Sequence, residues 1–432
     1  MRQIIVEQVA ARKSRGLRLA RRVALLGGTT TLEDCQVALR HLANPRHLIR
    51  GSAIAEYEQA FARQIGVRYA YSFSHGRVGL YALLLGLGIG SGDEVLLQVP
   101  THIVVANAIR YTGARPVYVD CTLKNYNMDL EQAEQRITPR TKALVLQHTF
   151  GIPVDLDAAL DLTRRHGIVL IEDCVHALGA TYDGRQVGSF GRAAFFSSEE
   201  TKTISTTMGG MVVTDDPELA ARVQEFQANC AWPTTWQAAR YVLKLLLYHL
   251  LTEPHLHRYT RMIYEFFEKR NPLPQPTTVE EIYGERPTDY EQRLSNAQAS
   301  LGLHQLRRLE ANLAHRRTVA QAYGERLSRE GFATPCPPAK AEPAYVRYPV
   351  WVKDRDATEG ATARHVVLGK WFTSVLEEAV SPVYGDYETG SCPRAEAAAV
   401  HLSNLPTHQR VSMQDVKAIT SALVSAERVT RR

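Results

Sequence analysis

Alternating strand and helix patterns between residues 53 and 215 constrain the fold of this 432-residue chain more than any other feature. Two of the strand patterns, ALVLQ at 143–147 and IVLIE at 168–172, are apolar at nearly every position. Strands of this kind are typical of a parallel sheet with both faces covered. Helical stretches of roughly 10–15 residues separate them, as in repeated strand–helix–strand units. The sequence therefore predicts an α/β fold with a doubly wound, mainly parallel sheet.

The pattern is regular enough to place each element of this sheet. We expect strands at 69–73, 94–98, 116–120, 143–147 and 168–172, and helices at 54–65, 76–87, 102–111, 129–136 and 157–166. Ligands in such sheets bind beyond the carboxyl ends of the strands. Residues that carry chemistry should therefore follow strand ends.

The composition changes near residue 232, where a strongly apolar stretch begins. Its centre, YVLKLLLYHLL at 241–251, is too short to cross a bilayer, which takes about 20 residues. Three interpretations are open: a helix packed on the fold or on a second subunit, which we favour, a lid over an apolar substrate, or an interfacial membrane helix. Peripheral membrane contact through 235–270 is the least favoured of the three.

The rest of the chain suggests a smaller second unit. The Pro-rich NPLPQP at 271–276 is expected to be a linker, followed by a helix over 295–327 and an α+β unit from 345 that ends in a helix at 412–427. The predicted organisation is an N-terminal arm at 1–45, a large domain at 46–231, an apolar insertion with linker at 232–285, and a small C-terminal domain at 286–432.

Charge and cysteine usage narrow the class of protein. The net charge of +6 is small, and the basic residues cluster only at the start of the chain, at Arg12, Lys13, Arg15, Arg18, Arg21 and Arg22. We favour a solvated arm lying on a partner subunit over a nucleic-acid arm or a targeting peptide. The start lacks the apolar core of a secretion signal, and the six cysteines are not at zinc spacing. We expect a cytoplasmic protein with no structural metal and no nucleic-acid partner.

Asp173 ends the predicted strand at 168–172. An ionised carboxylate buried there costs several kcal/mol unless a cation pairs with it. A protonated pyridine nitrogen would be such a partner, and the carboxylate would keep the ring an electron sink. The competing interpretation is a helix N-cap.

Lys202 comes about 25 residues later, in SSEETK before the turn TISTTMGG. A lysine in a loop is usually solvated. Burial against a cofactor instead lowers its pKa and makes the amine a nucleophile for Schiff-base chemistry. Ser197, five residues earlier, has a hydroxyl that can bind phosphate. Together with Asp173, these residues favour a buried cofactor lysine.

Three further residues, at two places in the chain, follow strand ends. Gly76 and Arg77 lie where a short strand passes into an apolar helix, and a helix start of this kind can hold phosphate. His102 follows the strand at 94–98 and could stack on a flat cofactor. Each feature is also common in ordinary helix starts, so their order in the chain carries the argument.

These landmarks, in this order, resemble the DegT/StrS-type sugar aminotransferases, a group of fold-type I pyridoxal-phosphate enzymes. The resemblance is carried by GLGIGSGDEVLL, ANAIRYTGARPVYVD, ITPRTKALVLQHTFGIPVDLDA and IEDCVHALGATYDGRQVGSFG, the last running on into KTISTTMGGMVVTDD. It implies a mainly parallel sheet of the seven-stranded type between helices, with a smaller C-terminal α+β domain.

The resemblance also implies roles for particular residues. Lys202 would form the Schiff base with pyridoxal 5′-phosphate, and Asp173 would pair with the pyridine nitrogen. The remaining cofactor positions are Ser197 and the Gly76–Arg77 turn at the phosphate, and His102 over the ring.

The chain departs from the family at several of these positions. His75-Gly76-Arg77 replaces the usual Ser-Gly-Thr. His176 replaces a Gln that binds the phenolic oxygen of the cofactor, and it could still form that hydrogen bond. Glu291 stands where members lend an Asn to the phosphate of the neighbouring subunit. Arg293 or Arg77 would then supply the missing phosphate contact.

The implied activity is transfer of an amino group from glutamate or glutamine to a keto group, by analogy on a nucleotide-linked sugar. The alternatives are a more apolar or lipid-linked acceptor, and a catalytically silent regulator or scaffold. A homodimer is expected, because this fold type builds its sites at a subunit boundary.

Overall fold

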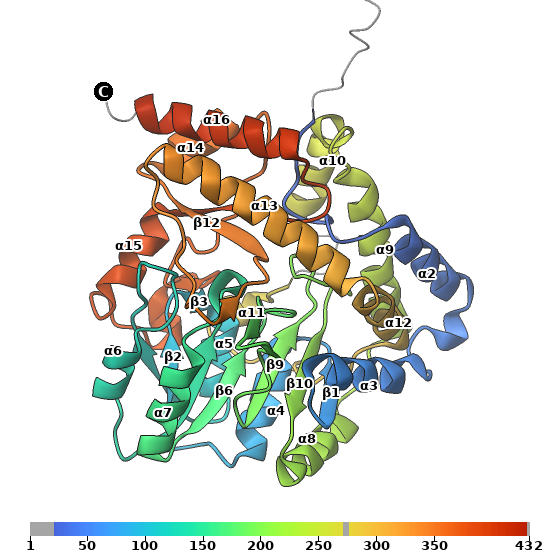
Figure 1. Cartoon of the computed structure of the whole chain (residues 1–432). Helices are drawn as coiled ribbons and strands as arrows, with labels where there is room; N and C mark the ends of the chain where they lie inside the picture. The colour runs from blue at the N-terminus through green and yellow to red at the C-terminus, as the bar shows by residue number, and fades with distance from the viewer. Residues whose placement is uncertain (1–20, 271–275, 430–432) are drawn as a thin grey trace, which may run out of the picture.

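The computed structural model describes residues 21–270 and 276–429 and contains the expected sheet (Figure 1). Its seven strands run in the order β1-β10-β9-β6-β5-β2-β4. All neighbours are parallel except β10, which is antiparallel to both β1 and β9. The strands are β1 Tyr69–Phe73, β2 Glu94–Gln98, β4 Arg115–Val119, β5 Thr141–Gln147, β6 Val169–Asp173, β9 Ala193–Ser197 and β10 Gly210–Thr214. The α/β fold is confirmed.

Helices cover both faces of this sheet, which explains the continuous apolar strands. They are α3 Ala53–Ile65, α4 Gly76–Gly86, α5 Ile103–Arg110, α6 Leu130–Gln135, α7 Leu156–His166 and α8 Pro217–Asn229. Alternate residues of one strand enter different cores: Val145 of β5 packs with α4, α5 and α8, and Leu144 with α3, α6 and α7. Since successive side chains point to opposite faces, every position of such a strand is buried.

The apolar insertion begins with α9, Thr235–Leu251, followed by α10, His257–Arg270, and the short α11, Val279–Ile282. One face of α9 is buried against α2, Leu32–Ala43, and α12, Asn296–Leu306. This arrangement is the packed helix that we favoured. Within the described residues, no helix is long and apolar enough to cross a bilayer.

The expected N-terminal arm and linker are only partly described. Residues 1–20, with most of the basic cluster, and 271–275 lie outside the described residues. The remainder of the arm includes α2, whose Asp34 forms a bidentate ion pair with Arg308. This part of the arm is therefore anchored on its own chain.

The helix expected over 295–327 is two helices, so that prediction was wrong in one respect. α12 ends at Leu306, and α13 covers Leu309–Arg329. Arg308 lies between them at φ −111° and ψ 7°. α12 packs on α3, whereas α13 packs on α16, Met413–Val429, so one straight helix could not serve both partners.

The C-terminal part is built on a two-stranded antiparallel sheet of β12, Arg347–Trp351, and β14, Leu402–Pro406. Its helices are α14 Arg355–Thr362, α15 Pro393–His401 and the terminal α16. The remaining short elements are η1 Pro45–His47, β3 Thr101–His102, η2 Thr149–Gly151, β7 Thr181–Tyr182, β8 Arg185–Gln186, β11 Ala341–Glu342, β13 Leu376–Glu377 and η3 Pro382–Gly385. The domain boundary predicted at 286 stays a prediction, and α12 lies beyond it against α3.

Candidate active site

A cavity of about 510 Å³ lies beyond the carboxyl ends of β6 and β9. The structure brings all seven predicted site residues to its wall: Gly76, Arg77, His102, Asp173, His176, Ser197 and Lys202. These residues come from four strand ends or helix starts and one loop. The strand-end rule therefore predicted residues that the structure brings to one cavity.

Asp173 and Lys202 are buried in this cavity. Asp173 is fully buried, and its Oδ1 accepts the Val175 N–H at 3.1 Å. Its Oδ2 is buried and accepts no hydrogen bond from the described residues. Burial raises the pKa of Asp173 to about 7 and lowers that of Lys202 to about 8. The amine is thus poised as a nucleophile near neutral pH.

Trp371 forms an aromatic wall over the lysine. The Lys202 Nζ lies 4.1 Å from the centroid of the Trp371 ring. His176 stacks on the same ring, with centroids 4.2 Å apart. The backbone N–H of Phe150 donates to His176 Nδ1 at 3.4 Å, which leaves Nε2 as the protonated, donating nitrogen. That tautomer suits a hydrogen bond to a phenolic oxygen.

Arg347 places a buried cation beside this wall. Its Cζ lies 3.4 Å from the Trp371 centroid, and its Nη1 donates to Asn404 Oδ1 at 3.2 Å. Within the described residues, no carboxylate forms an ion pair with it, and burial lowers its pKa to about 9. A buried cation of this kind favours an anionic group in the cavity.

The phosphate cradle forms where α4 starts against β9. A Cβ on Gly76 would lie 3.0 Å from the Phe196 carbonyl oxygen, so glycine permits this close approach. The N–H groups at the start of α4 lie beside Ser197, which also lines the cavity. Helix-start N–H groups and a hydroxyl together form a phosphate site.

The side chain of Arg77 is already engaged by the insertion. Its Nε lies 2.5 Å from Glu281 Oε1, its Nη2 donates to Glu281 Oε2 at 2.8 Å, and its Nη1 donates to the Pro276 carbonyl at 2.7 Å. The Glu281 side chain is fully buried. The guanidinium charge is therefore compensated, and the backbone of this turn, rather than the side chain, is the part suited to phosphate.

Glu291 stands at the position that family members lend to a neighbouring subunit, and Arg293 is its suggested substitute; both point to partners outside the cavity of this chain. Glu291 forms an ion pair with Arg286. Arg293 donates from Nε to the Gln227 carbonyl at 2.8 Å and stacks on Trp232. Neither Glu291 nor Arg293 lines the cavity of this chain.

His102 caps α5 and pairs with an acid that sequence analysis missed. Its Nδ1 accepts the Val104 N–H at 3.4 Å, and its Nε2 lies 3.3 Å from Glu378 Oε2. Both residues line the cavity. The ring is thus fixed at the cavity wall, where a flat cofactor could contact it.

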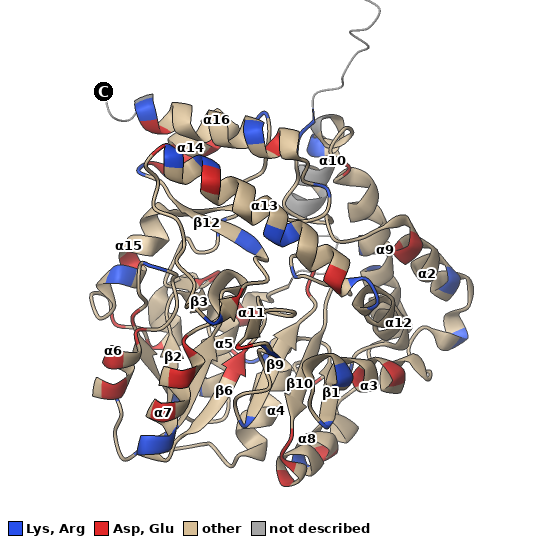
Figure 2. Cartoon of the chain, in the orientation of Figure 1, with Lys and Arg blue, Asp and Glu red and all other residues tan. Residues whose placement is uncertain are grey.

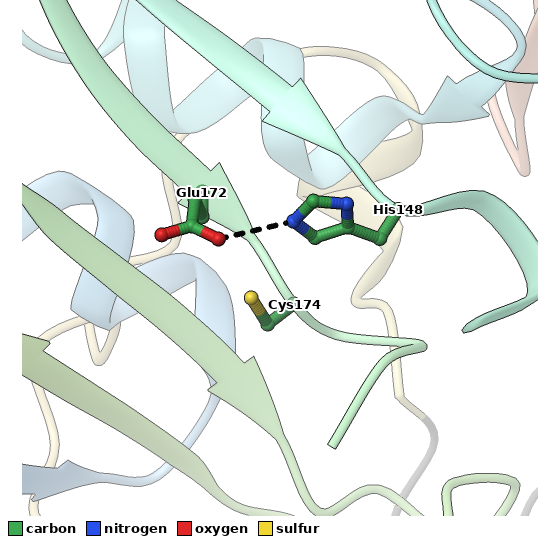
Figure 3. Close-up of side chains that lie close together, drawn as sticks. All are labelled: His148, Glu172 and Cys174. Atoms are coloured by element: carbon green, nitrogen blue, oxygen red, sulfur yellow. Dashed lines mark hydrogen bonds and ion pairs between the residues drawn. The ribbon is translucent and has the colours of Figure 1, made fainter. Parts of the chain in front are cut away.

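Glu172 and Cys174, the residues on either side of Asp173 in the sequence, form a buried cluster with His148 (Figure 3). His148 Nδ1 accepts the Val154 N–H at 3.1 Å, so its Nε2 donates to Glu172 at 3.2 Å. Three backbone N–H groups donate to Glu172 at 2.7 Å each, from Gly188, Phe190 and Gly191. Burial raises the pKa of the Cys174 thiol well above its usual value. The side-chain polar atoms of His148 and Glu172 are occupied by hydrogen bonds that fix the ends of β5 and β6.

The residues of the cavity fit pyridoxal phosphate. The buried, unpartnered Asp173 Oδ2 matches a pyridinium nitrogen, and the Gly76 cradle matches the phosphate. Lys202 supplies the amine for covalent attachment. This fold and this site define a pyridoxal-phosphate-dependent transferase.

The chain belongs to the DegT/DnrJ/EryC1/StrS aminotransferase family, whose model matches residues 30–424. It is 32% identical to GDP-perosamine synthase of Caulobacter vibrioides over 381 residues, which is 86% of this chain and 90% of that protein. It is 28% identical to the aminotransferase TlmJ from Streptoalloteichus hindustanus, with a TM-score of 0.73 over 96% of this chain and 100% of that one. It is 27% identical to S. venezuelae DesV, solved in complex with a ketimine intermediate, with a TM-score of 0.71 over 92% of this chain and 95% of that one. The protein is accordingly a pyridoxal-phosphate-dependent aminotransferase.

Sequence analysis missed residues of the cavity wall and the partner of Arg77. Trp371 and Arg347 of the wall come from the C-terminal part, and Glu281, which pairs with Arg77, comes from the insertion. Only Glu281 had a usable local signal, because Thr278 and Glu281 have the spacing of a capping box that starts a helix. The side chains that meet Lys202 from the C-terminal part depend on tertiary packing.

Proposed function

We propose that this enzyme moves an amino group from glutamate or glutamine to a keto group on a nucleotide-linked sugar, with Lys202 as its catalytic residue. The observation that carries the proposal is the pairing, in one cavity, of buried Lys202 with a buried Asp173 oxygen that no described residue satisfies. The sugar acceptor is supported by the similarity to GDP-perosamine synthase.

The chain's own residues would divide the work as follows. Lys202 would hold the cofactor through Nζ, and its amine would move a proton at the substrate carbon. Bound pyridoxal phosphate supplies an electron sink that stabilises negative charge on that carbon. Asp173 holds a proton on the pyridine nitrogen, and His176 donates from Nε2 to the phenolic oxygen. The Gly76 turn and Ser197 hold the phosphate, and His102 packs against the ring.

A dicarboxylic donor is supported by Arg347. Its buried guanidinium lies at the cavity wall and forms no ion pair with a described carboxylate. Arginine binds carboxylate with two parallel hydrogen bonds, which orients the donor as well as holding it. Among the described residues, none from α9 or α10 lines the cavity, so the described part of these helices gives no support for a lid over an apolar acceptor.

We also propose a homodimer in the cytoplasm. The dimer is supported by the resemblance to fold-type I enzymes, in which a neighbour completes the phosphate site. In this chain Glu291 and Arg293 stand away from their own cavity, which leaves a place for such a neighbour. Light scattering on the purified holoenzyme measures the mass directly, and a monomeric active enzyme would contradict the dimer.

The cofactor role is tested by absorbance and by product mass. Wild type with pyridoxal phosphate should be yellow, and Lys202→Ala should lose that band. Lys370→Ala is the matched control, since Lys370 lines the same cavity but is 60% exposed. Glutamate should then convert the wild-type cofactor to its amine form, and a panel of keto-sugar nucleotides should be aminated. A colourless wild type, or a Lys202→Ala enzyme that keeps both the band and the activity, contradicts the assignment.

A further inference from the structure

The loop that carries Lys202 is buried although it has no regular secondary structure. It joins β9 to β10, and every residue from 202 to 209 is buried. Loops usually lie at the surface, because a buried main chain needs partners for its N–H and C=O groups. The main chain of this loop must therefore find hydrogen-bond partners in other elements.

Two buried amide side chains supply such partners next to the lysine. Gln305 of α12 forms two hydrogen bonds with Ser205: its Oε1 accepts the N–H and its Nε2 donates to the carbonyl, both at 2.8 Å. Asn312 of α13 donates from Nδ2 to the carbonyl of Thr203 at 2.5 Å. Thr203 directly follows Lys202 in the chain. The main chain on this side of the lysine is thus held from two helices.

A third amide continues the pattern toward the end of the loop. Gln298 of α12 donates from Nε2 to the Met208 carbonyl at 2.6 Å. Gln298, Gln305 and Asn312 are spaced by seven residues, which is about two helical turns, so they face the same side. Helix α12 contains no Lys, Arg, Asp or Glu and is tan throughout in Figure 2. Its two glutamines therefore hold the loop without placing an ionised group on it.

The peptide that joins Lys202 to Thr203 is held by a connected network. Arg316 donates from Nε to Asn312 Oδ1 and from Nη2 to Thr29 Oγ1, each at 3.0 Å. Thr29 Oγ1 in turn donates to the Lys202 carbonyl at 3.3 Å. Both carbonyls of this stretch, those of Lys202 and Thr203, are therefore bound by side chains that Arg316 links together.

We propose that Gln305 and Asn312 are positioning residues for Lys202, because they hold the main chain from which its amine reaches the cavity. The inference rests on the proposed role of Lys202. A lysine side chain is a flexible four-carbon stem, so its amine is placed accurately only if its main chain is fixed. A displacement of about 1 Å can slow a reaction by roughly 100-fold.

A fixed loop also keeps water away from the amine. Burial is the largest cause of the lowered pKa of Lys202. A loosened loop that admits water would favour the charged form of the amine and raise this pKa toward the ordinary value of a lysine.

Asn296, on the same helix as Gln305, offers a matched control. It is also buried and also forms two hydrogen bonds with main-chain groups: its Oδ1 accepts the Ala53 N–H at 3.1 Å, and its Nδ2 donates to the His47 carbonyl at 2.7 Å. Both partners lie in other elements, α3 and η1. Replacing Asn296 thus reports the structural cost of losing a buried amide without touching the lysine loop.

The test compares Gln305→Met and Asn312→Leu with Asn296→Leu. In the cofactor-free protein, hydrogen exchange of a peptide covering 203–209 should be about tenfold faster in the two loop variants than in the control, because hydrogen bonds to this segment are lost. The pH at which uptake of pyridoxal phosphate levels off should rise in the loop variants alone. Asn312→Leu, on the other helix, keeps the comparison open if Gln305→Met does not fold.

The half-reaction with glutamate gives a further readout. Its limiting rate should fall by roughly 10- to 100-fold in the loop variants, while the half-saturating glutamate concentration stays that of wild type. Loop variants that match Asn296→Leu in exchange, pH profile and rate overturn this inference and leave the proposed function intact. A wild type that takes up no cofactor overturns the proposed function, and this inference with it.

Discussion

Replacement of Asp173 by Asn separates the cost of burying this carboxylate from its use in catalysis. Asn has nearly the same shape and can still accept the Val175 N–H that Oδ1 accepts at 3.1 Å. It cannot become ionised. The substitution should therefore stabilise the cofactor-free protein at alkaline pH and weaken the holoenzyme.

The magnitude follows from the pKa of the carboxyl group. Burial raises the pKa of Asp173 from 3.8 to about 7 in the folded protein. Between these values the folded state holds a proton that the unfolded state has lost, so the free energy of unfolding falls as pH rises. A shift of about three units corresponds to roughly 3–5 kcal/mol at about 1.4 kcal/mol per unit. Asn avoids this loss, so its advantage in the apoprotein should grow from near zero below the lower pKa to about 4 kcal/mol above the upper one.

With the cofactor bound, wild type should instead be more stable than Asp173→Asn. A pyridinium nitrogen compensates the carboxylate, and removing one partner of a buried ion pair costs about 3–5 kcal/mol. The half-reaction of Asp173→Asn with glutamate should slow by roughly 10²- to 10⁴-fold, since about 1.4 kcal/mol is tenfold in rate. The stabilisation that pyridoxal phosphate gives against unfolding should shrink as well.

Two measurements test this reasoning. Urea unfolding of both apoproteins across the pH range gives the stability difference, and single-turnover absorbance with glutamate gives the rate. An Asn apoprotein that is less stable than wild type at alkaline pH would refute the burial argument. An unchanged half-reaction would refute the pairing with the cofactor.

Three other perturbations have expected outcomes. Uptake of pyridoxal phosphate by the apoenzyme, measured by stopped-flow absorbance, should accelerate with pH and level off above about 8. The reason is that burial lowers the pKa of Lys202 to about 8 and only the neutral amine attacks. A rate that does not change with pH contradicts this. Glu281→Gln should lower the free energy of unfolding in urea by about 3 kcal/mol, since it leaves the nearly buried Arg77 without its carboxylate; equal stability would show that the pair contributes nothing. Arg347→Met should raise the KM for glutamate by about 100-fold and should keep the cofactor absorbance band. This factor corresponds to the loss of a pair of charged hydrogen bonds worth roughly 3 kcal/mol. A lower kcat at unchanged KM would assign Arg347 another role.

The sequence predicted those parts of the site that depend on local order along the chain. Both faces of strand β6 are covered by helices, so its sequence is a continuous apolar run that can be recognised from the sequence. Asp173 could then be placed at the end of this strand. Lys202 and Gly76 were found in the same way. Their place beyond a strand end is set by the topology of the sheet, which the strand–helix alternation already defines.

The partners of these residues could not be predicted, because they come from distant segments. Glu281 meets Arg77 across 204 positions of sequence, and Trp371 reaches Lys202 from the C-terminal part. The sequence showed Arg77 as a cation at a phosphate site, with no sign of the carboxylate that compensates it. Pairing between segments so far apart depends on how the insertion packs, and periodicity carries no information about it.

The insertion therefore belongs to the active site as much as to the surface. Lys244 of α9 is 1% exposed, and its Nζ lies 3.0 Å from an oxygen of Glu200, two residues before Lys202. Glu281 of the same insertion compensates Arg77 at the phosphate cradle. Deleting 235–285 would leave Glu200 and Arg77 without these partners, and an uncompensated buried charge costs several kcal/mol. A deletion would thus perturb the surroundings of Lys202 and the Gly76–Arg77 turn together. Single substitutions at Lys244 and at Glu281 remove one ion pair each, so they separate the two effects.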